Sequence, residues 1–315
     1  MNKLKLTCLA ASLSFASVTA NSALITDWNY LNDAGFDEWT SDAGSIDPTG
    51  IDESGATRSE FDGFAGDIFN APDPLFGGTL PKTLEWGVPY GAENPDLKKS
   101  ALVIEEAKEG TVTTSVVDGV GTLDFAEGTG LMHENWGVTG DTLVAATLFD
   151  GLFLGPTAPI ATPLAPAPVL QFGIIFEETY NTPSNDICKY EPTQLVGAAG
   201  INQEGCSDLF TLVLGPDVTF TEVGDDIYLQ NSFVLPIPGY DDYVYTLTTR
   251  LQGLEVLGSV DCGTGFTCVG FLTEEDKTNE LKAGFAISAA QVSEPGTLAI
   301  FGLGLLGLAA VRRRA

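Results

Sequence analysis

The sequence predicts an all-β protein, an antiparallel β-sandwich of jelly-roll type, and two observations lead to this fold class. Its central part contains about ten short runs rich in Val, Ile, Phe, Tyr and Thr, which Gly, Pro and Asp separate. No stretch there sustains the apolar periodicity of a helix. Many short strands with frequent turn residues are typical of sandwiches. The clearest runs cover residues 169–179, 208–214, 217–223, 227–235, 242–257 and 282–288.

A hairpin signal lies at residues 111–125, with the sequence TVTTSVVDGVGTLDF. Two runs of strand-forming residues flank the pair Asp118 and Gly119. An Asp-Gly pair favours the tight turn that joins two antiparallel strands. We therefore expect these two runs to pair with each other.

Both ends of the chain carry membrane-targeting features. Residues 1–20 combine two lysines, an apolar run and small residues before Ala20, which is typical of a secretory signal peptide. Residues 296–311 are uncharged and, as a helix, would span about 24 Å of a hydrocarbon core of about 30 Å. Three arginines follow, and the positive-inside rule places them in the cytoplasm. The sequence therefore predicts an exported body with one C-terminal transmembrane helix.

The chain divides into four segments by composition. Residues 1–20 form the signal peptide, and residues 21–80 form an irregular acidic segment rich in Gly and Asp. Residues 81–291 form the β-sandwich body, and residues 292–315 form the C-terminal segment with the transmembrane helix and arginine tail. A body of this length can bury one sizeable core.

The exported part is strongly acidic. Residues 21–293 keep nine of the 14 basic residues and 42 of the 43 acidic ones. Such a charge repels nucleic-acid phosphates and anionic lipid headgroups, so nucleic acid is excluded as a partner. Charged partners would be cations such as calcium or basic surfaces, and the alternative is a solvated acidic surface suited to salty water.

The cysteines agree with export. Cys188, Cys206, Cys262 and Cys268 form an even set, which suits an oxidising compartment. Among the three pairings that four cysteines allow, the spacing favours Cys188–Cys206 and Cys262–Cys268, because each closes a local loop. A zinc site is disfavoured, since the spacing is wrong and the chain has one histidine.

The C-terminal segment carries a resemblance to a known family. Ser293, Glu294 and Pro295 precede an apolar run rich in Gly and Leu, and Arg312, Arg313 and Arg314 end it. This order resembles the PEP-CTERM sorting signal of Gram-negative bacteria, in which serine here replaces the first proline of Pro-Glu-Pro. The resemblance implies processing by an exosortase, a membrane cysteine transpeptidase. It also implies a link to exopolysaccharide production, with release to the cell surface or the biofilm matrix.

A second resemblance covers the body. The segments LEWGVP (84–89), LMHENWGV (131–138), FEETYN (176–181), CSDLF (206–210) and CVGFLTEE (268–275) occur in one order. They resemble the THxN family of PEP-CTERM proteins, over roughly residues 81–290. His133 and Asn135 match the Thr-His-x-Asn signature, whereas Met132 stands where the family has threonine. The resemblance brings no established activity with it.

Catalysis is not expected from this sequence. His133 is the only histidine, so a Ser-His-Asp or Cys-His hydrolase has a single candidate base. No nucleophile elbow, phosphate-binding loop or zinc-protease motif appears. A glycosidase needs only two carboxylates, and pairs from Glu177, Glu178, Glu274 and Glu275 leave that alternative open.

Calcium is the cofactor that the sequence suggests. Adjacent acids stand at predicted strand ends in GDD (224–226), YDDY (240–243) and TEED (273–276), and calcium prefers several oxygen ligands at once. The candidate ligands are Asp225, Asp226, Asp241 and Asp242.

Glycan binding is the other candidate activity of the body. Trp86 and Trp136 each precede a glycine within the quoted motifs. An exposed indole can stack on a sugar, with His133, Asn135 and Glu178 as polar companions, whereas a tryptophan in the core could not. We therefore expect a non-catalytic binding or structural component of the exopolysaccharide matrix, with calcium-assisted glycan binding and a carboxylate-based glycosidase as alternatives.

Overall fold

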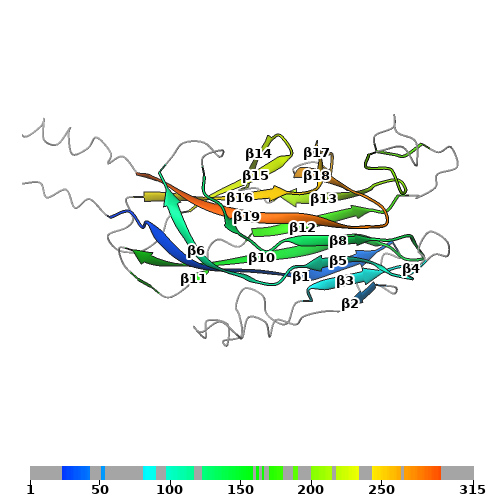
Figure 1. Cartoon of the computed structure of the whole chain (residues 1–315), viewed down its shortest axis with the longest axis horizontal. Coiled ribbons are helices and arrows are strands. Elements are labelled where there is room, and N and C mark those ends of the chain that lie inside the picture. Colours follow the sequence, from blue (N-terminus) through cyan, green and yellow to red (C-terminus); the bar gives the residue numbers. More distant parts are fainter. Residues whose placement is uncertain are drawn as a thin grey trace, which may run out of the picture.

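The computed structural model describes residues 23–42, 51–53, 81–89, 97–116, 123–158, 161–162, 165–166, 170–179, 187–190, 200–214, 218–233, 243–263 and 266–291. These residues contain 19 strands and no helix, which confirms the predicted all-β class (Figure 1). Within the described residues, 17 strands form one hydrogen-bonded sheet. The short strands β4 (Val88–Pro89) and β9 (Val138–Thr139) pair separately.

One run of neighbouring strands in the large sheet is antiparallel throughout. A short strand, β11 (Ala165–Pro166), also pairs with a member of this run, β10. In order across the sheet, the run consists of β6 (Lys108–Ser115), β1 (Asp27–Ser41), β10 (Leu143–Ala158), β12 (Leu170–Glu177), β13 (Asp208–Leu214), β18 (Thr267–Thr273) and β17 (Glu255–Ser259).

A second antiparallel run depends on the long strand β19 (Lys277–Gln291), drawn in orange in Figure 1. Residues 277–281 of β19 pair with β8, and residues 282–291 pair with β16. The short strand β7 (Ala126–Glu127) lies beside the second half. In order, the run consists of β14 (Thr219–Val223), β15 (Asp226–Phe233), β16 (Tyr243–Gln252), β19, β8 (Leu131–Asn135), β5 (Ser100–Ile104), β3 (Thr83–Trp86) and β2 (Ile51–Glu53).

The strand β6 joins the two runs, so the sheet is mixed, whereas the sequence predicts strands that are antiparallel throughout. Residues 108–113 of β6 pair antiparallel with β1. Thr114 and Ser115 then pair in parallel with Ile287 and Ser288 of β19. Because one strand is long enough to bond to both runs, the strands form one large mixed sheet instead of two separate antiparallel ones.

The core contains side chains from both runs. Trp28 of β1 meets the edge of Tyr245 of β16 with ring centroids 5.3 Å apart. Tyr30 of β1 meets Phe285 of β19 in the same way at 4.8 Å. Trp28 and Tyr245 are fully buried and belong to one continuous apolar cluster. Burial of these large rings supplies much of the apolar driving force for the fold.

The runs that the sequence analysis predicts as strands form strands in the structure, but some strand boundaries differ from the predicted ones. Residues 208–214 are β13 without change, and residues 282–288 form the middle of β19. Residues 242–257 divide into β16 and β17, because Gly253 turns the chain with a φ of +104°. A side chain at Gly253 would place its Cβ 2.5 Å from the carbonyl oxygen of Glu280, so only glycine fits this turn.

The hairpin predicted at residues 111–125 is described only in part. Residues 111–115 belong to β6, which among the described residues pairs with β1 and β19. Asp118 and Gly119 lie outside the described residues. The tight turn at Asp118 and Gly119 therefore stays a prediction.

The segment 21–80 was expected to be irregular, and the structure differs over part of it. Residues 27–41 form β1, which pairs with β10 along almost its whole length. Asn32, Asp33 and Gly35 interrupt the run of strand-forming residues in this segment, so the sequence gives little indication of a strand there.

The signal peptide at 1–20 and the C-terminal segment from residue 292 lie outside the described residues. In the part that is described, no helix is long and apolar enough to cross a membrane.

A buried chain of hydrogen bonds fixes β1 against β6 and β16. The indole Nε1 of Trp28 donates to Thr114 Oγ1 at 2.8 Å, and that hydroxyl donates to the carbonyl oxygen of Ile25 at 2.6 Å. The backbone N–H of Ile25 donates to the Tyr245 hydroxyl at 3.1 Å. Three distant segments thus share one set of buried polar groups.

We predict that Thr114→Val destabilises the protein by about 1–3 kcal/mol, because the indole N–H of Trp28 and the carbonyl of Ile25 lose their partner in the core. Chemical denaturation measures the change. The control is Thr111→Val, an exposed position on the same strand, for which we expect less than about 0.5 kcal/mol. Equal losses in the two variants would contradict the role of this hydrogen bond.

A second polar group, on β1 and β10, contains a carboxyl with a shifted pKa. Burial raises the pKa of Asp150 to about 6, and the negative charge of Asp33 adds to this, whereas a hydrogen bond from Asn32 acts against it. Asn32 Nδ2 donates to Asp150 Oδ1 at 2.5 Å. Asp33 in turn pairs with Lys82 at 2.9 Å. Asp150 therefore holds its proton more tightly in the folded state than in the unfolded chain.

This shift predicts a pH-dependent effect of Asp150→Asn. Above about pH 6 the buried carboxylate opposes folding, and as the pH falls through 6 the folded state gains a proton first, so the opposition disappears by about pH 4. The variant, which keeps an acceptor for Asn32, should be more stable than the native protein by about 1–3 kcal/mol near pH 8 and equal to it near pH 4. Urea denaturation at both pH values measures this, and a difference that does not change with pH would contradict it.

Candidate functional site

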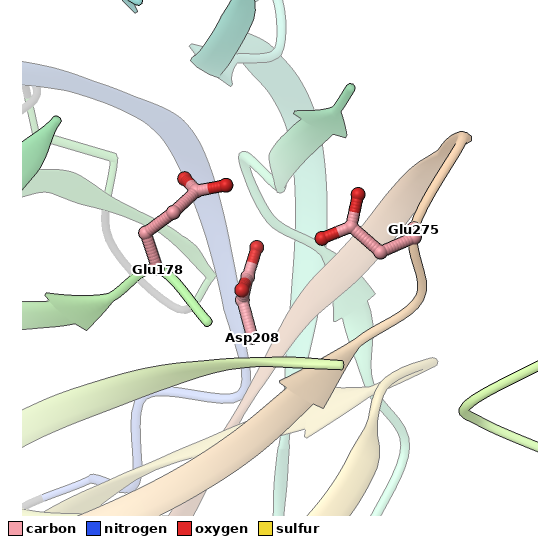
Figure 2. Close-up of side chains that lie close together, drawn as sticks. All are labelled: Glu178, Asp208 and Glu275. Carbon is pink, nitrogen blue, oxygen red and sulfur yellow. The ribbon is translucent and has the colours of Figure 1, made fainter. Parts of the chain in front are cut away.

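Three carboxylates from separate parts of the chain converge in the structure: Glu178, Asp208 and Glu275 (Figure 2). Strand pairing brings them together. Glu178 directly follows β12, whose neighbour β13 begins at Asp208. Asp208 pairs with Thr273, the last residue of β18, and Glu275 stands two residues further on. The register of three strands therefore determines this cluster, which we call the carboxylate cluster.

The carboxylate cluster is compact and largely removed from water. One carboxylate oxygen of each residue lies within 4.8 Å of those of the other two. Asp208 is 0% exposed and Glu275 is 1% exposed, whereas Glu178 keeps part of its surface accessible. Buried like charges at this spacing repel one another strongly, so the cluster must bind protons or a cation.

The pKa values of all three carboxyls are shifted upward. Burial raises the pKa of Glu275 to about 9, and the charges of Glu178 and Asp276 add to the effect. Burial also raises the pKa of Asp208 well above its usual range, with Glu275 as the next cause. The pKa of Glu178 is raised by burial and then by Asp208, and a hydrogen bond from Trp86 acts against the shift.

Asn135, the last residue of β8, faces the carboxylate cluster. Its side chain lies against Asp208 and Glu275, since it lowers the pKa of both carboxyls. The residue is 0% exposed, yet among the described residues neither amide atom has a hydrogen bond of good geometry. A fully buried amide in this state is rare in native structures.

Local hydrogen bonds hold Asp208 in place. The backbone N–H of Thr179 donates to Asp208 Oδ1 at 2.6 Å, and the Thr179 hydroxyl donates to the carbonyl of Cys206 at 3.0 Å. Asn202 Oδ1 accepts a hydrogen bond from the backbone N–H of Ser207 at 2.8 Å. In the part of the chain that the structure describes, Asp208 Oδ2 has no hydrogen-bond partner. One oxygen is thus used for positioning, and the other is available to a ligand.

The turn that carries Glu275 is closed by the side chain of Asn279. The Oδ1 atom of Asn279 accepts from the backbone N–H of Glu274 at 2.8 Å, and its Nδ2 atom donates to the carbonyl of the same residue at 2.9 Å. Asp276 adopts a φ of +55°, which asparagine and aspartate tolerate better than other residues with side chains. An ion pair between Glu274 and Lys277 lies on the outside of this turn.

An aromatic layer lies beside the carboxylate cluster. Trp86 stacks on His133 with centroids 5.6 Å apart, and both rings contact Phe176. The indole Nε1 of Trp86 donates to Glu178 Oε2 at 3.3 Å. The contact between Trp86 and Glu178 thus connects the aromatic layer to the carboxylate cluster.

His133 is a packed core residue in this layer. Its Nδ1 atom lies 3.0 Å from Thr273 Oγ1, and the side chain is 3% exposed. Burial lowers the pKa of His133 to about 3, so the ring is neutral at physiological pH. A base this weak is poorly suited to general-base catalysis.

The structure brings four of the five predicted ligand-binding residues together: Trp86, His133, Asn135 and Glu178. Trp86 is 0% exposed, so it offers no face for a sugar. Trp136 lies apart from the aromatic layer, partly exposed, with Lys98 Nζ 3.9 Å from the centre of its ring. Its backbone N–H and carbonyl both bond to the Ser100 hydroxyl.

The predicted calcium ligands lie elsewhere. Asp225 and Asp226 stand at the turn between β14 and β15, where Asp226 accepts hydrogen bonds from Tyr228 and Gln252. Asp241 and Asp242 lie outside the described residues, so calcium binding at these four positions stays a prediction. Among the described residues, the one group of three acids spaced for a metal ion is the carboxylate cluster.

Sequence reasoning missed Asp208, although it stands within the quoted motif CSDLF. It placed Glu275 in the acidic run TEED (273–276), one of the three runs that suggest calcium, but did not join it to Asp208 or Asn135. The available signal was positional, since each of the five quoted body motifs contributes one residue to the cluster or to Asn135 and Trp86 beside it.

Comparison with known protein families gives a match at the C-terminal end of the chain. A family model for the PEP-CTERM protein-sorting motif matches residues 291–314. The chain carries a PEP-CTERM sorting motif. The match contains Ser293, Glu294 and Pro295 as well as Arg312, Arg313 and Arg314. The motif implies export, processing by an exosortase and targeting to the cell surface. No curated protein matches the chain.

Both predicted disulfides are present, as expected for an exported PEP-CTERM protein. Cys188 bonds to Cys206 and Cys262 bonds to Cys268, across 18 and 6 residues. The first bond is buried and lies next to Ser207 and Asp208. It therefore supports the segment that positions the carboxylate cluster.

We predict that the two disulfides contribute unequally to stability. Loop closure implies about 3 kcal/mol for Cys188–Cys206 and about 2 kcal/mol for Cys262–Cys268. Replacing each pair by serines and measuring unfolding in denaturant tests this, with one double variant as the control for the other. The expectation fails if loss of the Cys262–Cys268 bond destabilises the protein as much as loss of Cys188–Cys206.

Proposed function

We propose that this chain is an exported protein that an exosortase processes, and that its body acts as a non-catalytic binding or structural component of the exopolysaccharide matrix. The PEP-CTERM motif at residues 291–314 is the observation that carries the proposal. The two disulfides and the strongly acidic composition agree with an oxidising, extracytoplasmic location. The C-terminal helix would hold the precursor in the inner membrane of a Gram-negative cell until processing.

We further propose membership of the THxN family and a sandwich-like arrangement of the body. His133 and Asn135, the two signature residues that this sequence keeps, both point to the buried side of β8. The contacts of Trp28 with Tyr245 and of Trp86 with Phe176 join strands that are far apart in the pairing order. Such contacts support a sheet that folds over on itself around one core.

Catalysis is the weaker alternative. Carboxyls with raised pKa values are typical of glycosidases, and the carboxylate cluster contains three of them. A polysaccharide, however, must reach both acids, and Asp208 and Glu275 are almost completely buried. Burial of the acids therefore favours a role in binding a small ion over hydrolysis of a polymer.

Sorting can be tested in a host with and without its exosortase. We predict that the native chain loses its C-terminal segment and reaches the cell surface or medium only when the exosortase is present. The double variant Glu294→Ala, Pro295→Ala should stay in the membrane fraction with an intact C-terminus. Mass spectrometry of the C-terminal peptide and fractionation measure the two effects.

The matched control is Ser293→Pro, which restores the usual Pro-Glu-Pro order and should be processed at least as well as the native chain. Processing of the double variant, or of the native chain without the exosortase, would contradict the proposal.

Calorimetric titration with the exopolysaccharide of the producing strain distinguishes a binding role of the body from a purely structural one. Saturable heat indicates binding, and its absence leaves the structural role.

A further inference from the structure

We propose that Glu178, Asp208, Glu275 and Asn135 form a calcium-binding site inside the body. The site is distinct from the acidic turns at residues 225–226 and 241–242, and it does not depend on how the chain is sorted. Figure 2 shows the three carboxylates turned toward a common centre from separate segments.

The charges of the cluster favour a bound cation. Three carboxylate oxygens within 4.8 Å of one another create a strongly negative point in a place where water is largely excluded. Glu178 and Asp208 have no lysine or arginine partner among the described residues, since the ion pairs there involve other acids. A divalent cation can balance these charges at this one place.

Asn135 is the independent observation that points to a ligand. It is completely buried beside Asp208 and Glu275, and neither its carbonyl oxygen nor its amide nitrogen has a hydrogen bond of good geometry within the described residues. Its Oδ1 atom can act as a fourth oxygen ligand of a cation at the centre of the cluster. Asp208 Oδ2, which also lacks a hydrogen-bond partner there, can act as another.

The chemistry of these donors selects the ion. The group contains only oxygen ligands and no cysteine or histidine, so zinc and copper are disfavoured. Calcium accepts six to eight oxygens in flexible geometry, and three carboxylates that bind through one or two oxygens each, with one amide, can supply about that number. Magnesium would need to keep several waters, for which the buried side of the cluster leaves little access.

The position of the site gives the ion a structural role. Glu178 follows β12, Asp208 begins β13, Glu275 lies between β18 and β19, and Asn135 ends β8. A cation bound to all four would cross-link the two runs of strands at the point where His133 already contacts Thr273. Calcium binding should therefore stabilise the whole body.

The test uses the protein as cells export it, treated with EGTA and then titrated with calcium chloride. Isothermal calorimetry should give one calcium ion bound at this site. At a calcium concentration about 100 times the Kd, the unfolding equilibrium constant should fall about 100-fold relative to EGTA. No bound calcium, with identical unfolding in calcium and EGTA, would overturn the proposal, and equal stabilisation by magnesium would overturn the choice of ion.

Two substitutions of the same type separate this site from other acids. Asp208→Asn should abolish calcium binding and the calcium-dependent stabilisation. In EGTA it should be at least as stable as the native protein, because it removes a buried charge, and its denaturation curve there shows whether it folds. Asp225→Asn, at an exposed turn acid, should bind calcium as the native protein does. Loss of binding in Asp225→Asn but not in Asp208→Asn would overturn the proposal in favour of the turn.

If Asp208→Asn fails to fold, Glu275→Gln provides the same comparison from another strand connection. It should also lose calcium binding while keeping the size of the side chain. A Glu275→Gln variant that binds calcium with unchanged affinity would overturn the assignment. Neither result bears on exosortase processing, so the two proposals fail independently.

Discussion

The pairing of β19 is the constraint on which the rest of the structure depends. This single strand pairs with β16 through residues 282–291, and its residues 277–281, 284–285 and 287–288 pair with β8, β7 and β6. Backbone groups of a strand must be paired when buried, so the positions of four other strands follow from the course of β19. Through β6, the same strand also connects the two antiparallel runs into one sheet.

The carboxylate cluster is a consequence of this arrangement. Its acids stand where strands end, and neighbouring structure holds them there: Thr179 binds Asp208, Asn279 closes the turn of Glu275, and a disulfide braces the approach to β13. Two buried acids and a partly buried one oppose folding unless protons or a cation compensate their charges. The hydrogen bonds and the disulfide around these acids nevertheless hold them in place. Such an arrangement is typical of groups that serve function at a cost in stability.

Export and ion binding fit one another in this protein. The sorting motif implies export, and disulfides form in oxidising compartments outside the cytoplasm. Cys188–Cys206 and the proposed calcium ion act on the same region, one as a covalent link and the other as a reversible one. The stability of the body would then depend on the medium around the cell, whereas exosortase processing depends on the C-terminal segment.

Local features of the sequence by themselves determined the all-β class, the two disulfides and the sorting motif, because each is encoded by residues near one another in the chain. They also pointed to Trp86, His133, Asn135 and Glu178, since these residues stand in recognisable motifs. The sheet order, the strand β1 within a segment expected to be irregular, and the meeting of Asp208 with Glu275 were decided by tertiary structure alone. These features follow from which distant strands pair and in which register. A local sequence pattern indicates that a segment is a strand, but it does not specify its partner.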